Sequence, residues 1–91
     1  MTEIHVLAFV QTEWVNGKKT FERRENKVAF EELNDALFAV EDQCNRMAQM
    51  YESAGYLVSH EDRENIFHYF NRNGLEGVWN FYIDTMNVCH L

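Results

Sequence analysis

Residues 29–54 read AFEELNDALFAVEDQCNRMAQMYESA. Apolar side chains recur in this stretch at alternating spacings of three and four, at Phe30, Leu33, Leu37, Val40, Cys44, Met47 and Tyr51. At about 100° per residue, these seven positions fall on one stripe of an α-helix. The segment therefore predicts one long amphipathic helix. Gly55 suits its C-terminus, because glycine adopts the left-handed conformation without steric cost.

The side of this helix opposite the stripe is acidic and includes one aromatic residue. On a helix, residues 31 and 35 are about 6 Å apart along the axis, and residues 35 and 42 about 10 Å apart. An aromatic side chain among charges is typical of interface hot spots, although a solvated helix face with one stray aromatic residue has the same pattern. The candidate partner-binding row consists of Glu31, Asp35, Phe38, Asp42 and Gln49.

The segment before the helix predicts a β-hairpin. Residues 3–15 alternate as a strand does, and both of their faces are apolar as far as Phe9, which favours an interior strand. Asn16-Gly17 follows and tolerates the positive φ angles of a two-residue type I′ turn. A second strand is expected over 19–28, where alternating charges are typical of a guarded sheet edge.

The last third of the chain supports two interpretations. In the first it forms strands over 56–61, 66–71 and 78–86, with a turn at 62–65 and a hairpin closed by Asn73-Gly74. In the second it forms two helices, since residues 59–62 and 73–76 resemble capping boxes. The high content of aromatic and β-branched residues favours strands, and a lone hairpin is too small to cover a helix of about seven turns.

The predicted fold is thus a single α+β domain over residues 1–91 in the order ββαβββ. One antiparallel sheet carries the long amphipathic helix across one face. The order ββααα remains the alternative, because the apolar residues between 75 and 86 also match helical spacing.

Charge is unevenly distributed along the chain. The formal net charge is −7; residues 1–27 hold five bases and four acids, whereas residues 28–91 hold three bases and eleven acids. Such a protein is repelled by phosphate backbones and by anionic lipid surfaces, so neither direct nucleic-acid binding nor membrane binding is expected. The simplest role of this charge is solubility. With no signal peptide and no span of ~20 apolar residues visible, a cytoplasmic location is expected.

No motif predicts catalysis, a cofactor or a metal. The glycines are scattered, and the histidines and cysteines lack metal-ligand spacing, with Cys89 and His90 adjacent and therefore divergent on a strand. Cys44 lies on the apolar stripe and is expected to be a buried, inert thiol. An enzyme would have to assemble its site from distant residues such as Cys89 and His68, and nothing local supports one.

Two functions remain from the sequence. The first is a small acidic, non-enzymatic binding protein that occupies a basic surface of a partner through the helix row. Its sharpest form is an inhibitor that mimics nucleic acid. The second is a self-associating module that forms a homodimer through a sheet face or edge. This alternative rests on the apolar residues on both faces of the first strand, which exceed what one helix can cover.

Overall fold

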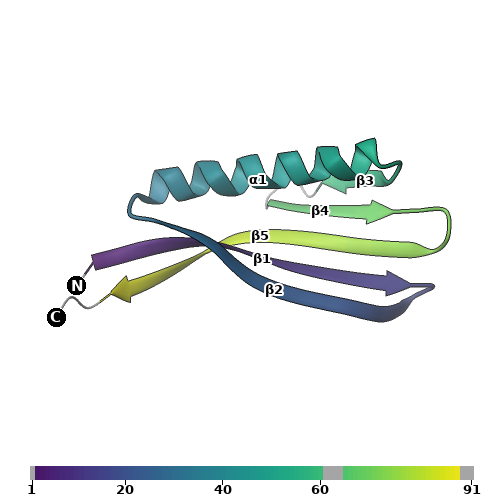
Figure 1. Ribbon diagram of the computed structural model, residues 1–91, viewed down its shortest axis with the longest axis horizontal. Coiled ribbons are helices and arrows are strands. Elements are labelled where there is room, and N and C mark those ends of the chain that lie inside the picture. Colours follow the sequence, from purple (N-terminus) through teal and green to yellow (C-terminus); the bar gives the residue numbers. More distant parts are fainter. Residues whose placement is uncertain (1, 61–64, 89–91) are drawn as a thin grey trace.

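The computed structural model describes residues 2–60 and 65–88 and places five strands and one helix there. The elements are β1 (Thr2–Val15), β2 (Lys18–Phe30), α1 (Leu33–Ser53), β3 (Leu57–His60), β4 (Asn65–Phe70) and β5 (Leu75–Val88). All strand pairs are antiparallel, in the order β2-β1-β5-β4-β3, and α1 packs across one face of the sheet (Figure 1). The predicted ββαβββ fold is confirmed, and the helical interpretation of the last third is wrong. The predicted turn at 62–65 lies largely outside the described residues.

Both hairpin turns at one end of the sheet depend on positive φ angles. In the β1–β2 turn, Asn16 has φ 50° and Gly17 has φ 81°, as a type I′ turn requires. The β4–β5 turn is longer than the predicted Asn73-Gly74 pair: the Asn71 side-chain oxygen accepts hydrogen bonds from the backbone N–H groups of Asn73 and Leu75. The Asn16 N–H donates to the Gly74 carbonyl at 2.9 Å, so the two turns support each other.

The helix begins four residues later than predicted, because β2 continues through Phe30 and pairs that residue with His5. Its C-terminus matches the prediction. Gly55 has φ 95°, the Tyr56 N–H donates to the Tyr51 carbonyl, and the Gly55 N–H donates to the Glu52 carbonyl. This bonding is a Schellman motif.

The buried line of α1 differs from the predicted stripe. The fully buried residues are spaced by four, at Ala36, Val40, Cys44 and Ala48. Four residues turn a helix by 400°, so this line drifts about 40° per step around the axis. A helix that crosses a twisted sheet obliquely is buried in this way. Consequently Leu33 and Leu37, which were predicted to be core residues, are 46% and 49% exposed.

Aromatic rings from adjacent strands form the core beneath α1. The ring centroids of Phe9 and Trp79 are 4.7 Å apart, and those of Trp79 and Phe81 are 5.6 Å apart. Gly77 on β5 pairs with Tyr69 on β4, and a β-carbon at Gly77 would fall on the Tyr69 ring. The missing side chain is therefore what allows this ring to lie flat on the sheet.

We expect Gly77→Ala to lower the free energy of unfolding by about 1–3 kcal/mol, because the added methyl group must displace a fully buried ring. Urea denaturation followed by circular dichroism measures this change. Ser59→Ala, at an exposed position of β3, is the control and should stay within about 0.5 kcal/mol of the wild type. Equal stability of Gly77→Ala and the wild type would contradict the close packing of Tyr69 on Gly77.

Candidate functional site

Four of the five predicted partner-binding residues lie on α1. Asp35, Phe38 and Gln49 are exposed, Asp42 is half-buried, and Phe38 is 74% exposed. Glu31 is exposed but lies in the bend between β2 and α1, so its predicted place on the helix is wrong. The reason is that β2 extends through residue 30, which delays the first helical turn.

The structure adds Glu41 to this surface and weakens the contribution of Asp42. A hollow of about 140 Å³ is lined by Phe38, Glu41, Asp42 and Asn45. Asp42 Oδ2 lies 3.0 Å from the Arg46 guanidinium, one helical turn away, so this carboxylate is partly neutralised within the chain. We call Asp35, Phe38, Glu41, Asp42 and Gln49 together the acidic helix face.

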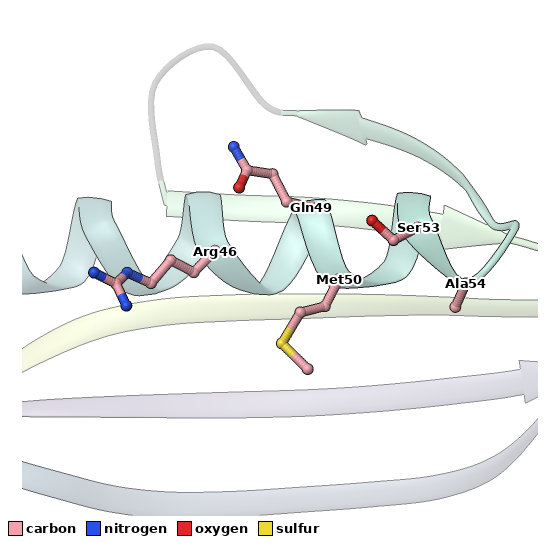
Figure 2. Close-up of a pocket in the computed structure, with 5 residues that line it drawn as sticks. All are labelled: Arg46, Gln49, Met50, Ser53 and Ala54. Atoms are coloured by element: carbon pink, nitrogen blue, oxygen red, sulfur yellow. The ribbon is translucent and has the colours of Figure 1, made fainter.

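A wider hollow of about 680 Å³ follows the outer flank of α1 toward its C-terminus. Figure 2 shows its lining, which comes from α1 and its C-cap: Arg46, Gln49, Met50, Ser53 and Ala54. Pockets for small molecules enclose the ligand and bring several polar groups together from different elements. This open hollow does neither, so its shape differs from that of a small-molecule pocket.

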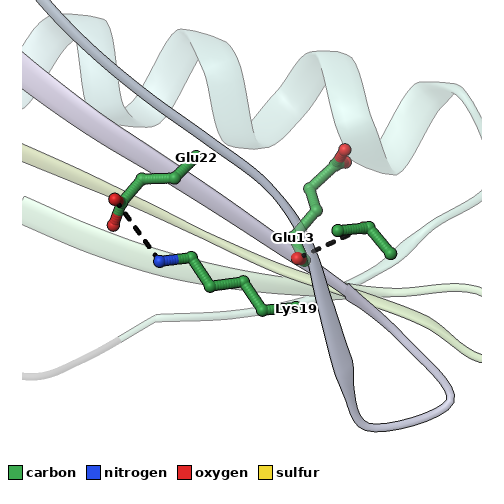
Figure 3. Close-up of polar contacts among 4 residues, drawn as sticks. Glu13, Lys19 and Glu22 are labelled. Carbon is green, nitrogen blue, oxygen red and sulfur yellow. Dashed lines mark hydrogen bonds and ion pairs between the residues drawn. The ribbon is translucent and has the colours of Figure 1, made fainter.

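Three of the five bases of β2 contact side chains of their own chain. The guanidinium carbon of Arg23 lies 5.0 Å from the centre of the Phe9 ring, and the ammonium of Lys27 lies 5.6 Å from the same ring. These cations cover the flank of the core that α1 leaves open. Figure 3 shows Lys19 paired with Glu22, with 3.4 Å between Lys19 Nζ and Glu22 Oε2. β2 itself remains exposed along nearly its whole length at the edge of the sheet.

A buried polar cluster joins the last turns of α1 to the sheet. The Gln11 amide donates to the hydroxyl oxygens of Tyr51, at 3.2 Å, and Tyr69, at 3.1 Å. The Trp79 indole N–H donates to the Tyr51 oxygen at 3.1 Å. The Tyr69 hydroxyl in turn donates to Glu13 at 2.8 Å. The Gln11 amide, the Trp79 indole N–H and the Tyr69 hydroxyl each therefore have an acceptor, as buried donors require.

This cluster is suited to holding the fold together. Burial raises the pKa of Tyr69 far above its ordinary value, with the hydrogen bond to Glu13 adding to the shift, so its hydroxyl stays protonated at neutral pH.

Burial also raises the pKa of the Cys44 thiol, which confirms the expectation of a buried cysteine in its least nucleophilic form. Cys89 and His90 lie outside the described residues.

Gln11 and Glu13 are not among the residues that the sequence predicts to be functional. The signal was present, because strand alternation places both on the face of Leu7 and Phe9, and a polar residue on a buried face needs a partner. What the sequence lacks is the identity of that partner, since Tyr51 and Tyr69 are brought there by the chain's tertiary fold.

Comparison with known proteins gives no match, whether to a family model, to a curated protein or to a solved structure. Within residues 2–60 and 65–88, no three His, Cys, Asp or Glu side chains lie close enough to hold a metal ion. The single helix in that part of the chain is not apolar enough to cross a membrane.

We expect alkaline unfolding of the protein to involve Tyr69. Its pKa is raised in the folded state, so its contribution to stability is complete below about pH 10, where tyrosine in the unfolded chain ionises, and is lost as the pH rises further. Tyrosinate absorbance and circular dichroism, followed together against pH, should show the last tyrosine ionising as the fold is lost. In Tyr69→Phe that step should be missing. Ionisation of all four tyrosines while the protein stays folded would contradict this expectation.

Proposed function

We propose that the protein is a non-enzymatic binding module that docks its acidic helix face on a basic surface of a partner protein. The sharpest form of this proposal is an inhibitor that excludes nucleic acid from that surface. The observation that supports it best is Phe38, which is 74% exposed beside a hollow that carboxylates also line. Exposing a phenylalanine there costs solvation without stabilising the fold, and aromatic residues in such positions are frequent binding hot spots.

The distribution of charge in the fold supports a directed encounter. Residues 31–54 contain six acids and one base, whereas β2 contains five bases and two acids and forms one edge of the sheet (Figure 1). A molecule with its charges separated in this way is oriented in the field of a basic partner, which mainly raises the association rate. Because Arg46 already pairs with Asp42, Asp35 and Glu41 are the carboxylates most available to a partner.

Asp35→Lys combined with Glu41→Lys tests the proposal. The change raises the net charge by four units on an exposed surface, so the fold should survive, as circular dichroism would verify. Immobilised wild-type protein is expected to retain basic proteins from a lysate at low salt and release them at high salt. The variant should lose them. Phe38→Ala should weaken binding of the purified partner by about 30-fold, as expected for a hot-spot residue.

Glu3→Lys combined with Glu25→Lys is the matched control, since it gives the same net charge from exposed strand positions away from α1. This control should retain the same partners as the wild type. If the helix variant and the control behave alike, only net charge matters and the acidic helix face is not the binding site. If the protein is an inhibitor that mimics nucleic acid, added DNA should compete with it for the partner. Simultaneous binding of DNA and protein would reject nucleic-acid mimicry.

A further inference from the structure

The face of the sheet away from α1 is more apolar than a solvated face should be. Alternation from the buried residues Leu7 and Phe9 places the even-numbered residues of β1 on this second face. They are Thr2, Ile4, Val6, Ala8, Val10, Thr12 and Trp14, of which Val6, Ala8 and Thr12 are already buried by neighbouring residues of the same chain. Antiparallel sheets with one solvated face normally carry polar residues there. We call this surface the open face.

Neighbouring strands extend the apolar character of the open face. Val78, Tyr82 and Met86 of β5 lie on it opposite Thr12, Ala8 and Ile4. At its far side Leu57 is 75% exposed and, with Phe70, lines a hollow of about 230 Å³. Toward β2 it ends in charged residues such as Glu22 and Arg24. An apolar centre with a polar rim is the usual composition of a protein interface.

No element in the described part of the chain covers the open face, because α1 packs on the opposite side. The edges of the sheet are less suited to contact. The β2 edge carries alternating charges over 13 residues, and the β3 edge is only four residues long. Charged or short edge strands oppose pairing with further strands. Any contact through the sheet is therefore favoured at its face.

We propose that the open face is the interface between two copies of this chain, stacked sheet against sheet. With a rise of about 3.3 Å per residue and about 4.8 Å between strands, the whole five-stranded sheet, its charged β2 rim included, has a projected area of about 800 Å². A face of that size is large enough for an interface of standard size, in which each partner buries about 800 Å² of accessible surface. Paired sheets of this kind share a core about 10 Å thick.

The small net charge of the open face opposes a second copy only weakly. The whole chain carries −7, but the open face carries two bases, Lys19 and Arg24, and three acids, Glu22, Glu76 and Asp84. Stacking leaves the two acidic helices on opposite outer surfaces, about 30 Å apart. That separation exceeds the Debye length of about 8 Å at physiological ionic strength, so their repulsion is largely screened.

Sedimentation equilibrium and tryptophan fluorescence test this proposal. At about 100 µM, the wild type should have twice the 10.9 kDa mass of one chain, at low and high salt alike. Tyr82→Glu places a charge at the centre of the open face and should raise the dimer dissociation constant by at least about 30-fold while circular dichroism is unchanged. On dilution, the emission of Trp14 should shift to the red as the interface is exposed, and Trp14→Phe should lose that shift.

Phe38→Glu is the control for the other surface and should remain dimeric. Three outcomes would overturn the proposal: a monomeric wild type, a dimer that dissociates in Phe38→Glu but not in Tyr82→Glu, or a mass that grows with concentration beyond the dimer. If the wild type is monomeric and its open face binds an apolar dye, the face is a binding surface for a different partner. The proposal is independent of the acidic helix face, since monomeric Tyr82→Glu should still bind basic proteins.

Discussion

The arrangement of the whole molecule depends on the Tyr51 side chain. Its hydroxyl oxygen accepts hydrogen bonds from Gln11 on β1 and Trp79 on β5, and its ring lies 4.2 Å from that of Tyr69 on β4. One residue in the last turns of α1 therefore contacts three strands. Without the Tyr51 oxygen, the N–H groups that Gln11 and Trp79 direct at it would lose their acceptor. Each such loss would cost about 1–3 kcal/mol, a large share of the stability of a domain of this size.

The two ends of α1 are held differently, and this difference determines which surface the helix presents. Its C-terminus is fixed by Tyr51 and the Schellman motif. Its N-cap, Glu32, makes no side-chain hydrogen bond, and Leu33 and Leu37 are only half covered. With its C-terminal end fixed, the oblique path of the helix turns Ala36 and Val40 toward the sheet and Phe38 outward. The orientation of the acidic helix face thus follows from aromatic packing some four turns away.

Most of the fold could be predicted from local pattern, and the failures have a common physical cause. The Asn16-Gly17 turn, the charged β2 edge and the Gly55 terminus each depend on a residue and its immediate neighbours. The start of α1 and its buried line depend on contacts made elsewhere: β2 extends because Phe30 pairs with His5, and the buried line drifts because the sheet is twisted. The site was limited in another way. Periodicity indicated Asp35, Phe38 and Gln49 on the outer side of the helix, whereas the pairing of Asp42 with Arg46, four residues later, is a local pattern that the prediction did not use.

The two proposed surfaces lie on opposite sides of the sheet and do not compete for residues. In a stacked pair, both acidic helix faces would point outward, each with its own Phe38 exposed. Such a pair would be bivalent. Binding of a second basic patch on the same partner would then be intramolecular, and the gain in avidity would depend on whether the spacing of the partner's patches matches about 30 Å. When the spacings match, a modest affinity at each helix is sufficient for tight binding of the pair. This matters because Arg46 already neutralises one carboxylate of each face, which limits the electrostatic contribution of a single helix.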